Sequence, residues 1–264
     1  MVLSIKKRIA MKKLALLSTL VFSLLQADAM VHTQEHHATT HWGYTGHIAP
    51  QYWGTLNEKF AMCGIGKAQS PINITQEVSV TTNDLKPIVF DYHADAIDVV
   101  NNGHAIQVNV DPHSSINIDG KHFVLKQFHF HSPSENEIEG RSFPLEAHFV
   151  HLDKNGDIAV IAVLFELGKE NKALQTIFEA MPNKSGEKNS ITLNSAMIDT
   201  LLPKEKSYYY FDGSLTTPPC SEGVKWMVLK NYQTLSKEQL KLFTSVIQGN
   251  NRPVQPLNAR KVIK

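Results

Sequence analysis

Two histidines that flank a phenylalanine are the first residues of this sequence whose types and spacing could do chemistry. They lie in QFHFHSPSEN, residues 127–136, as His129, Phe130 and His131. In a β-strand, side chains two positions apart share a face, so both imidazoles project to one side and Phe130 to the other. A neighbouring strand-like stretch, LEAHFVH, offers His148 as a third ligand. Three neutral imidazoles that leave one position open are typical of a catalytic zinc site, whereas structural zinc sites are closed by four protein ligands.

Each of two candidate ligands has a polar neighbour on its own strand face. Gln127 is two residues before His129, and Glu146 is two residues before His148. Metal-bound histidines usually give their other ring nitrogen to such a partner, which fixes the tautomer and the orientation of the ring. An H-x-H pair alone is a weak signal, because half-buried histidines satisfied by the backbone are common. The two partners therefore strengthen the interpretation as a Zn²⁺ site.

The elements that must position these residues are mostly strands. Residues 96–110, 115–131, 145–153 and 157–168 alternate or run apolar and are rich in β-branched residues. Between or within them lie the turn signals Asn102-Gly103, Asp119-Gly120 and Asn155-Gly156. Helical spacing is confined to NKALQTIFEAMP and SKEQLKLFTSVIQ, at residues 171–182 and 236–248. The pattern predicts one β-rich domain with a few surface helices.

The N-terminus has the layout of a secretory signal. KKRIAMKK supplies positive charge, LALLSTLVFSLL is a short apolar run, and small residues end at Ala29. We therefore expect a signal peptide at 1–29, a flexible histidine-rich arm at 30–40 and the folded domain at 41–264. The location would be periplasmic or secreted, with no stable membrane span after cleavage. An uncleaved anchor is the alternative, and Met11 is a second candidate start.

Composition and cysteine count limit the partners and the redox state. The 264 residues include 26 basic and 25 acidic ones, with no basic patch among aromatics, so we expect no nucleic-acid partner. Cys63 and Cys220 are the only two cysteines. In an exported protein such a pair is expected to form a disulfide, and two buried free thiols are the alternative.

Several further stretches resemble the α-class carbonic anhydrases: HWGY, QSPINI, NNGHA, QFHFHSPSEN, EAHFVH and GSLTTPPCSEGVKWMVL. They occur in the family's order and cover the chain from Trp42 to about Arg260. The SPSEN variant and the cysteine pair are similar to the exported bacterial branch. The resemblance implies a mainly β (α+β) fold around a large, mostly antiparallel twisted sheet. It also implies a lyase that reversibly hydrates carbon dioxide, a small-molecule substrate, to bicarbonate and a proton.

The resemblance assigns roles around the metal. His129, His131 and His148 match the zinc ligands. Thr216 matches the residue whose hydroxyl donates to a carboxylate, here Glu135, and therefore accepts from a zinc-bound hydroxide and aims it at carbon dioxide. Thr217 matches the residue that borders bicarbonate.

Two further groups of residues are also assigned by the resemblance. An apolar wall for carbon dioxide would consist of Val150, Val160, Leu215, Val224 and Trp226, each of which taken alone would be interpreted as core. His104 matches a proton shuttle, a role that suits a side chain titrating near neutral pH. Waters between it and the metal would be ordered by Tyr44, Asn102 and Gln107. Asn136, where many relatives have histidine, leaves the hydrogen bonding around Glu135 open.

Two other functions are compatible with the same fold. Non-catalytic binding modules of this family lack one or more ligand histidines, whereas this chain has all three. A periplasmic zinc buffer is suggested by the histidine-rich arm. Bacterial relatives are often dimers, which favours a homodimer.

Overall fold

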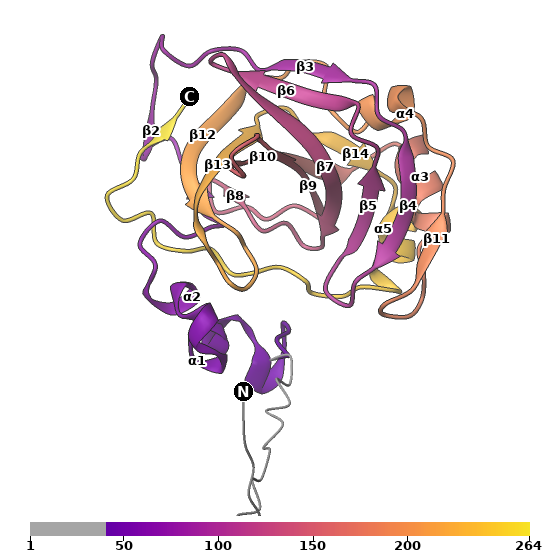
Figure 1. The fold of residues 1–264 in the computed structure, drawn as a ribbon, viewed down its shortest axis with the longest axis horizontal. Coiled ribbons are helices and arrows are strands. Elements are labelled where there is room, and N and C mark those ends of the chain that lie inside the picture. The colour runs from indigo at the N-terminus through magenta and orange to yellow at the C-terminus, as the bar shows by residue number, and fades with distance from the viewer. Residues whose placement is uncertain (1–40) are drawn as a thin grey trace, which may run out of the picture. The chain divides into compact units, whose positions relative to one another are not determined.

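The structure is a computed structural model that describes residues 41–264. The predicted signal peptide and the predicted histidine-rich arm lie outside the described residues. Within them, one sheet of 13 strands dominates the fold (Figure 1). Its main path runs β11-β4-β5-β7-β9-β10-β13-β12-β15-β2, with β3 and β6 joined through β7 and β14 paired to β10. A small second sheet pairs β1 with β8.

The bounds of the elements are as follows. The strands are β1 (Asn73–Ile74), β2 (Ser79–Val80), β3 (Val89–Tyr92), β4 (Ala96–Asn101), β5 (Ile106–Val110), β6 (Ser114–Ile118), β7 (Lys121–His131), β8 (Glu137–Ile138), β9 (Leu145–Leu152), β10 (Ile158–Leu167), β11 (Lys188–Ser190), β12 (Tyr208–Ser214), β13 (Glu222–Leu229), β14 (Gln233–Leu235) and β15 (Val262–Ile263). The helices are α1 (Trp53–Leu56), α2 (Met62–Ile65), α3 (Lys172–Glu179), α4 (Ser195–Asp199) and α5 (Lys237–Thr244), with 3₁₀ turns at Gly46–Ile48, Pro50–Tyr52 and Glu58–Phe60.

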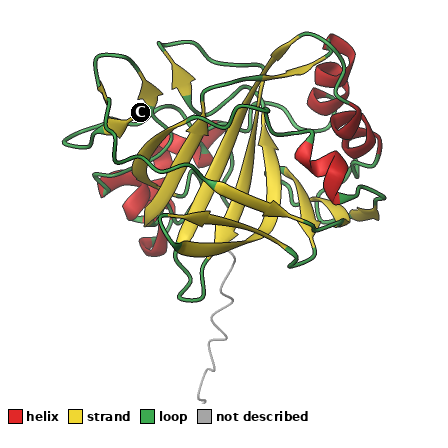
Figure 2. Cartoon of the chain, turned by 90° about the horizontal axis from the view of Figure 1, so that it is seen from above, coloured by secondary structure: helices red, strands yellow, loops and turns green. Residues whose placement is uncertain are grey.

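Most neighbouring strands of the large sheet are antiparallel. The parallel pairs are β10 with β13, β10 with β14, and β15 with β2. The long strands lie side by side with a strong twist (Figure 2). The expected large, mostly antiparallel sheet is therefore confirmed.

The centre of the sheet separates a packed core from a functional face. On β7, Phe130 is fully buried and its ring meets Phe178 of α3 and Phe243 of α5. The histidines on either side of it in sequence project to the opposite face, as the strand period requires. Packing of Phe130 against the two helices therefore holds β7 in place at the point where it carries His129 and His131.

The two longer helices begin where the sequence predicts. The Asn171 side chain accepts from the backbone of Ala173 and Leu174 at the start of α3. At α5, Ser236 and Gln239 form a capping box. The sequence did not predict α1, α2 and α4, because helices of four or five residues are stabilised by tertiary packing and not by their own propensity. Among residues 41–264, no helix has the length and apolar character needed to cross a bilayer.

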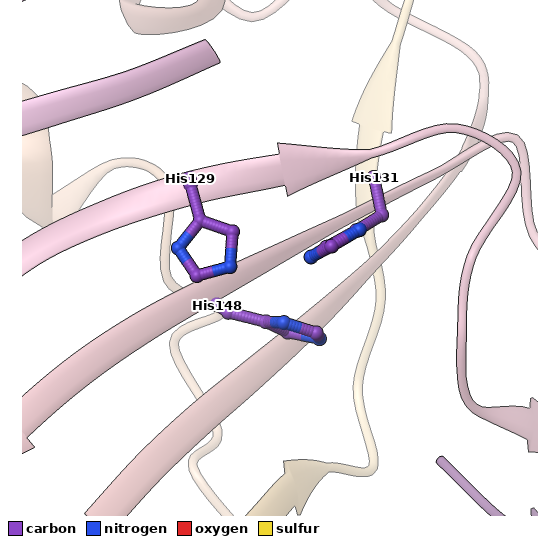
Figure 3. A group of neighbouring side chains, drawn as sticks. All are labelled: His129, His131 and His148. Atoms are coloured by element: carbon purple, nitrogen blue, oxygen red, sulfur yellow. The ribbon is translucent and has the colours of Figure 1, made fainter. Parts of the chain in front are cut away.

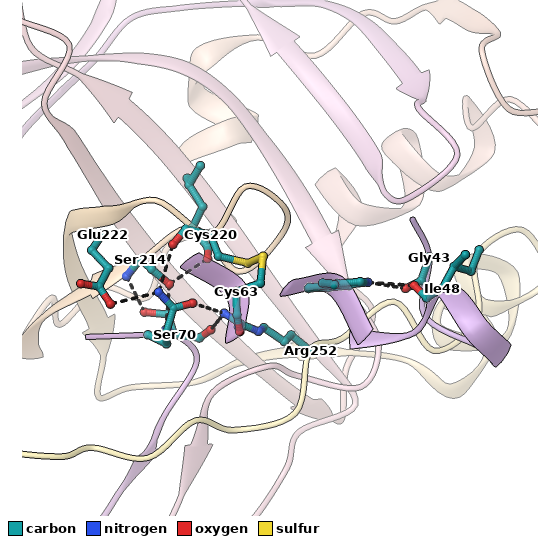
Figure 4. The surroundings of a disulfide bond; sticks show 11 residues. Gly43, Ile48, Cys63, Ser70, Ser214, Cys220, Glu222 and Arg252 are labelled. Carbon is teal, nitrogen blue, oxygen red and sulfur yellow. Dashed lines mark hydrogen bonds between the residues drawn. A yellow bond between two sulfur atoms is a disulfide. The ribbon is translucent and has the colours of Figure 1, made fainter. Parts of the chain in front are cut away.

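The expected disulfide is present. Cys63 lies in α2 and Cys220 in the loop between β12 and β13, with their Cα atoms 5.0 Å apart (Figure 4). The bond joins segments 157 residues apart in sequence. It therefore ties the first helices to the loop that carries Thr216.

A buried histidine outside the metal site should make stability depend on pH. The Nε2 atom of His151 lies 2.8 Å from the Tyr92 hydroxyl, and its Nδ1 lies 2.9 Å from the carbonyl oxygen of Phe149. Burial lowers the pKa of His151 from its usual 6.5 to about 3. Below pH 6.5 the His151 side chain therefore binds a proton in the unfolded chain but not in the folded chain. The free energy of unfolding consequently falls as pH falls.

We expect this one side chain to cost about 2 kcal/mol of the free energy of unfolding between pH 7 and pH 5. Urea unfolding of the parent and of His151→Gln at both pH values measures it. Glutamine can keep both hydrogen bonds without titrating. Between pH 7 and pH 5, the free energy of unfolding of the variant should therefore fall by about 2 kcal/mol less than that of the parent. Equal losses in both proteins would contradict the assignment.

Candidate metal centre

Three histidines converge on one point of the functional face. His129 and His131 project from β7, and His148 projects from the adjacent β9, where it is paired in register with His129 (Figure 3). One ring nitrogen from each lies within 4.8 Å of the other two. The structure thus brings together the three ligands that the sequence analysis proposed, and among residues 41–264 this is the one group of three or more with ligand spacing.

The ring nitrogens that face away from the centre are occupied. His129 has Nδ1 2.9 Å from Oε1 of Gln127, and His131 has Nδ1 2.7 Å from the carbonyl oxygen of Asn250. Both rings must donate through Nδ1, because an amide oxygen and a carbonyl oxygen only accept. Their Nε2 atoms are therefore unprotonated and available, and Nε2 of His131 is buried without a hydrogen-bond partner.

His148 presents the other ring nitrogen. Its Nε2 lies 2.9 Å from Oε1 of Glu146, so Nδ1 is the atom left for a cation. Glu146 is itself held firmly: its Oε2 accepts from the backbone of Glu135 and Asn136, and its Oε1 accepts from the Asn136 amide. The sequence left open how Asn136 takes part in the hydrogen bonding around Glu135. In the structure, the Asn136 side-chain amide donates to the Glu146 carboxylate beside His148.

Burial sets the protonation of the three rings. It is the largest cause that lowers the pKa of His129, His131 and His148, and the mutual proximity of the rings lowers the pKa of His129 and His148 further. Neutral imidazoles with free lone pairs are what a divalent cation needs. The donor set, its spacing and the orphaned Nε2 of His131 fit a zinc ion.

Glu135 lies beside the metal ligands and is fully buried. Its Oε1 accepts from the backbone N–H of Arg252 at 2.8 Å and lies 3.5 Å from Nδ1 of His131. Burial raises the pKa of Glu135 well above its usual value, while hydrogen bonds from the Arg252 backbone and the Thr216 side chain oppose that rise. The structure thus brings Thr216 to Glu135.

The loop that carries Thr216 is held at both ends (Figure 4). At its start, the hydroxyl of the buried Ser214 accepts from the backbone of Ser70, and the Ser70 hydroxyl accepts from the backbone of Ser214. At its end, Cys220 is fixed by the disulfide, and Glu222 accepts from the backbone of Ala68. These ties place Thr216 without help from the metal ligands.

The five residues proposed as an apolar wall form one cluster. Val160, Val224 and Trp226 are buried together, and Val150 and Leu215 pack against them. The cluster adjoins the metal site, because the Trp226 ring meets His148 edge-on at 4.9 Å between centroids. Val150 follows His148 by two residues and so shares its strand face.

A cavity of about 160 Å³ borders His129 and His131. It is lined by Trp42, Tyr44, Asn102, His104, Ala105, Gln107, Gln127, His129, His131 and Thr217. His104 stacks on Trp42 with the ring centroids 3.7 Å apart. Burial, and then the neighbouring His41, lower the pKa of His104. The Tyr44 hydroxyl is buried without a partner, and burial raises its pKa. The predicted shuttle and water-ordering residues thus share one space.

Sequence reasoning missed two residues at this site. Asn250 supplies the carbonyl oxygen behind His131, and its side-chain amide donates to the carbonyls of His104 and Phe130. Arg252 supplies the N–H that holds Glu135, while its buried guanidinium donates to Gln69, Ser70 and Cys63. Both act on the metal site mainly through backbone atoms, so their residue types gave no signal.

Comparisons with known proteins agree with the geometry. Residues 48–264 match the family model described as eukaryotic-type carbonic anhydrase. A carbonic anhydrase of Neisseria gonorrhoeae is 50% identical over 244 residues, which cover 91% of this chain and 94% of that protein. Among solved structures, the α-carbonic anhydrase of Thermovibrio ammonificans, in complex with the inhibitor sulfanilamide, is 51% identical with a TM-score of 0.83, covering 85% of this chain and 99% of that one. The Photobacterium profundum α-carbonic anhydrase is 44% identical with a TM-score of 0.79, covering 85% and 100%.

The chain therefore belongs to the eukaryotic-type, or α-class, carbonic anhydrase family. It is an enzyme of that family, and its reaction is the reversible hydration of carbon dioxide to bicarbonate and a proton. These relatives are named carbonic anhydrases, so they support the enzyme and not the alternatives of a non-catalytic module or a zinc buffer.

Proposed function

We propose that this carbonic anhydrase works with one zinc ion held by Nε2 of His129, Nε2 of His131 and Nδ1 of His148. The observation that carries the proposal is that three imidazoles meet with Nδ1 of His129 and of His131 already hydrogen-bonded and with Nε2 of His148 lying 2.9 Å from a carboxylate oxygen of Glu146. Zinc supplies the Lewis acidity that makes a water molecule nucleophilic near neutral pH. Metal analysis should find one zinc per chain in the parent protein and far less zinc in His131→Ala. A protein that folds and hydrates carbon dioxide without zinc would overturn the proposal.

The chain's own residues orient the reaction. The Thr216 hydroxyl donates to Glu135, which leaves its lone pairs to accept from the attacking oxygen and aim it. Carbon dioxide lies against Val150, Val160, Leu215, Val224 and Trp226, which exclude water from that side. Thr217 borders the bicarbonate product. Gln127 and Glu146 hold the rings of His129 and His148.

His104 receives the proton that the reaction releases and passes it to the solvent. Its place in the cavity with Tyr44, Asn102 and Gln107 supports this role, since these polar groups can order the waters between. Because its pKa is lowered, the His104 imidazole stays neutral down to a pH below 6.5. The neutral ring is able to accept a proton.

Replacing His104 by alanine should therefore lower kcat in dilute buffer roughly a hundredfold, the low end of the range for general acid–base catalysis. The ratio kcat/KM should stay unchanged, because it does not include the proton's exit. Stopped-flow hydration with and without added imidazole measures both constants, and imidazole should restore kcat in the variant. In the parent, kcat should rise with pH through an apparent pKa below 6.5. A variant with unchanged kcat in dilute buffer would exclude the shuttle role.

Export to the periplasm or the medium is part of the proposal. It is supported by the charge and apolar pattern of residues 1–29 and by the disulfide between Cys63 and Cys220, since such bonds persist in oxidising compartments. The division into signal peptide, arm and a domain at 41–264 stays a prediction, as does the homodimer. Mass spectrometry of the exported protein would test cleavage after Ala29.

A further inference from the structure

A row of polar side chains leads from the cavity wall to the edge of the large sheet. On β5, Gln107 and Asn109 alternate with core residues and so face the cavity side. They are paired in register with His129 and Gln127 of β7. On the other side of β5, Asn109 is paired with Asp98 of β4.

Asp98 reaches this face because β4 is irregular. The register between β4 and β5 shifts between Ala96 and Asp98, with Ala96 opposite Val110 and Asp98 opposite Asn109. In a regular strand Asp98 would share the core face of Ala96, since side chains two apart point the same way. The extra residue, Ile97, therefore turns a carboxylate onto the cavity face, where Asp98 is only 8% exposed.

The row is joined by short hydrogen bonds. Oδ1 of Asp98 accepts from Nδ2 of Asn109 at 2.7 Å, and Oδ1 of Asn109 accepts from Nε2 of Gln107 at 2.7 Å. The other carboxylate oxygen of Asp98 lies 3.2 Å from Nζ of Lys188 on β11. The last acceptor of the row is Oε1 of Gln107, which accepts a long hydrogen bond from Nδ2 of Asn102 at 3.5 Å.

The carboxylate fixes the direction of every bond in the row. An ionised carboxylate can only accept, so Asn109 must turn its NH₂ group toward Asp98 and its oxygen toward Gln107. Gln107 must then turn its NH₂ group toward Asn109. The group that Gln107 presents to the cavity is therefore its oxygen.

We propose that Asp98, acting through Asn109, is a positioning residue that keeps the Gln107 amide oxygen facing the proton path to His104. The inference rests on the proposed function, in which waters in this cavity carry the proton. A water that donates to Gln107 keeps its lone pairs free to receive the proton. An NH₂ group in that place would donate to the water, occupy a lone pair and make the water a poorer base.

The test compares four proteins by stopped-flow hydration of carbon dioxide in dilute buffer and with excess imidazole. Asp98→Asn lets the row reverse, since asparagine can also donate to Asn109. We expect kcat in dilute buffer to fall about two- to tenfold, the range that one ordinary hydrogen bond is worth. The ratio kcat/KM should not change, and imidazole should restore kcat. Glu187→Gln, which removes an exposed carboxylate next to Lys188, is the control for charge and should behave as the parent.

The swapped double variant, Asp98→Asn with Asn109→Asp, makes the test specific. Aspartate at 109 can again only accept from Gln107, and asparagine at 98 can donate to it, so the oxygen of Gln107 faces the cavity once more. We expect the swap to recover most of the lost kcat. A role of Asp98 limited to its ion pair with Lys188 would not be rescued in this way.

The outcomes separate this inference from the proposed function. A parent that does not hydrate carbon dioxide overturns both. An active parent with an unchanged kcat in Asp98→Asn, or a swap that recovers nothing, overturns this inference alone. If Asp98→Asn fails to fold, Asn109→Leu removes the same link, and it should show the same loss of kcat at constant kcat/KM; an unchanged kcat there overturns the inference as well.

Discussion

Replacing His148 by alanine should remove tight zinc binding and lower kcat/KM for hydration on the order of 10⁴-fold or more. The variant loses one of three ligands, which should cost more affinity than the roughly 10- to 100-fold that loss of an outer partner costs. Without the cation, water is a poor nucleophile near neutral pH. Metal content after dialysis and stopped-flow hydration measure the two effects.

The fold should survive this change. Glu146 loses its contact with His148 but keeps three donors, from the backbones of Glu135 and Asn136 and the Asn136 amide. No unpaired buried carboxylate results. His151→Gln is the matched control, because His151 lies three residues further along β9 and faces away from the site. It should keep one zinc and the parent's activity; loss of zinc in the control, or full zinc in His148→Ala, would contradict the ligand assignment.

Replacing Thr216 by valine should lower kcat/KM about a hundredfold, the loss expected when a reacting group is misplaced by about an ångström. Valine has nearly the shape of threonine without its hydroxyl, so the attacking oxygen loses the acceptor that aims it. Zinc content should not change, because the loop is held by Ser214, the disulfide and Glu222. Thr234→Val, on β14 and away from the cavity, is the control and should keep full activity.

A second variant tests whether Thr216 acts through Glu135. Glu135→Gln replaces an obligate acceptor by an amide that can donate, so the Thr216 hydroxyl is no longer forced to donate to it. If the two residues form one orienting chain, the double variant should lose no more than either single variant. Losses that multiply, or a Thr216→Val enzyme as active as the parent, would show that the pair does not orient the nucleophile.

Much of the site could be predicted because strand periodicity is regular. The two-residue spacing of His129 and His131 fixed their common face, and the same rule paired Gln127 with His129 and Glu146 with His148. The helices α3 and α5 were predictable from the helical spacing of their apolar residues. The family resemblance supplied what spacing could not, such as the link between Thr216 and Glu135.

The rest depends on contacts that residue types do not encode. His131 is oriented by the carbonyl of Asn250, 119 residues away, and Glu135 by the backbone N–H of Arg252. Every residue except proline has both of these groups, so no pattern of residue types could indicate them. The position of Asp98 depends on the extra residue Ile97 in β4. This residue breaks the two-residue alternation of the strand, and that alternation is the basis for predicting strand faces from a sequence.

The most direct test of the account is stopped-flow hydration of carbon dioxide by the purified protein as isolated, after a chelator has removed its metal, and after zinc is returned. The account predicts rapid hydration that disappears with the metal and returns with one equivalent of zinc per chain. Hydration that persists in fully metal-free protein, or no hydration with one zinc bound, would contradict it.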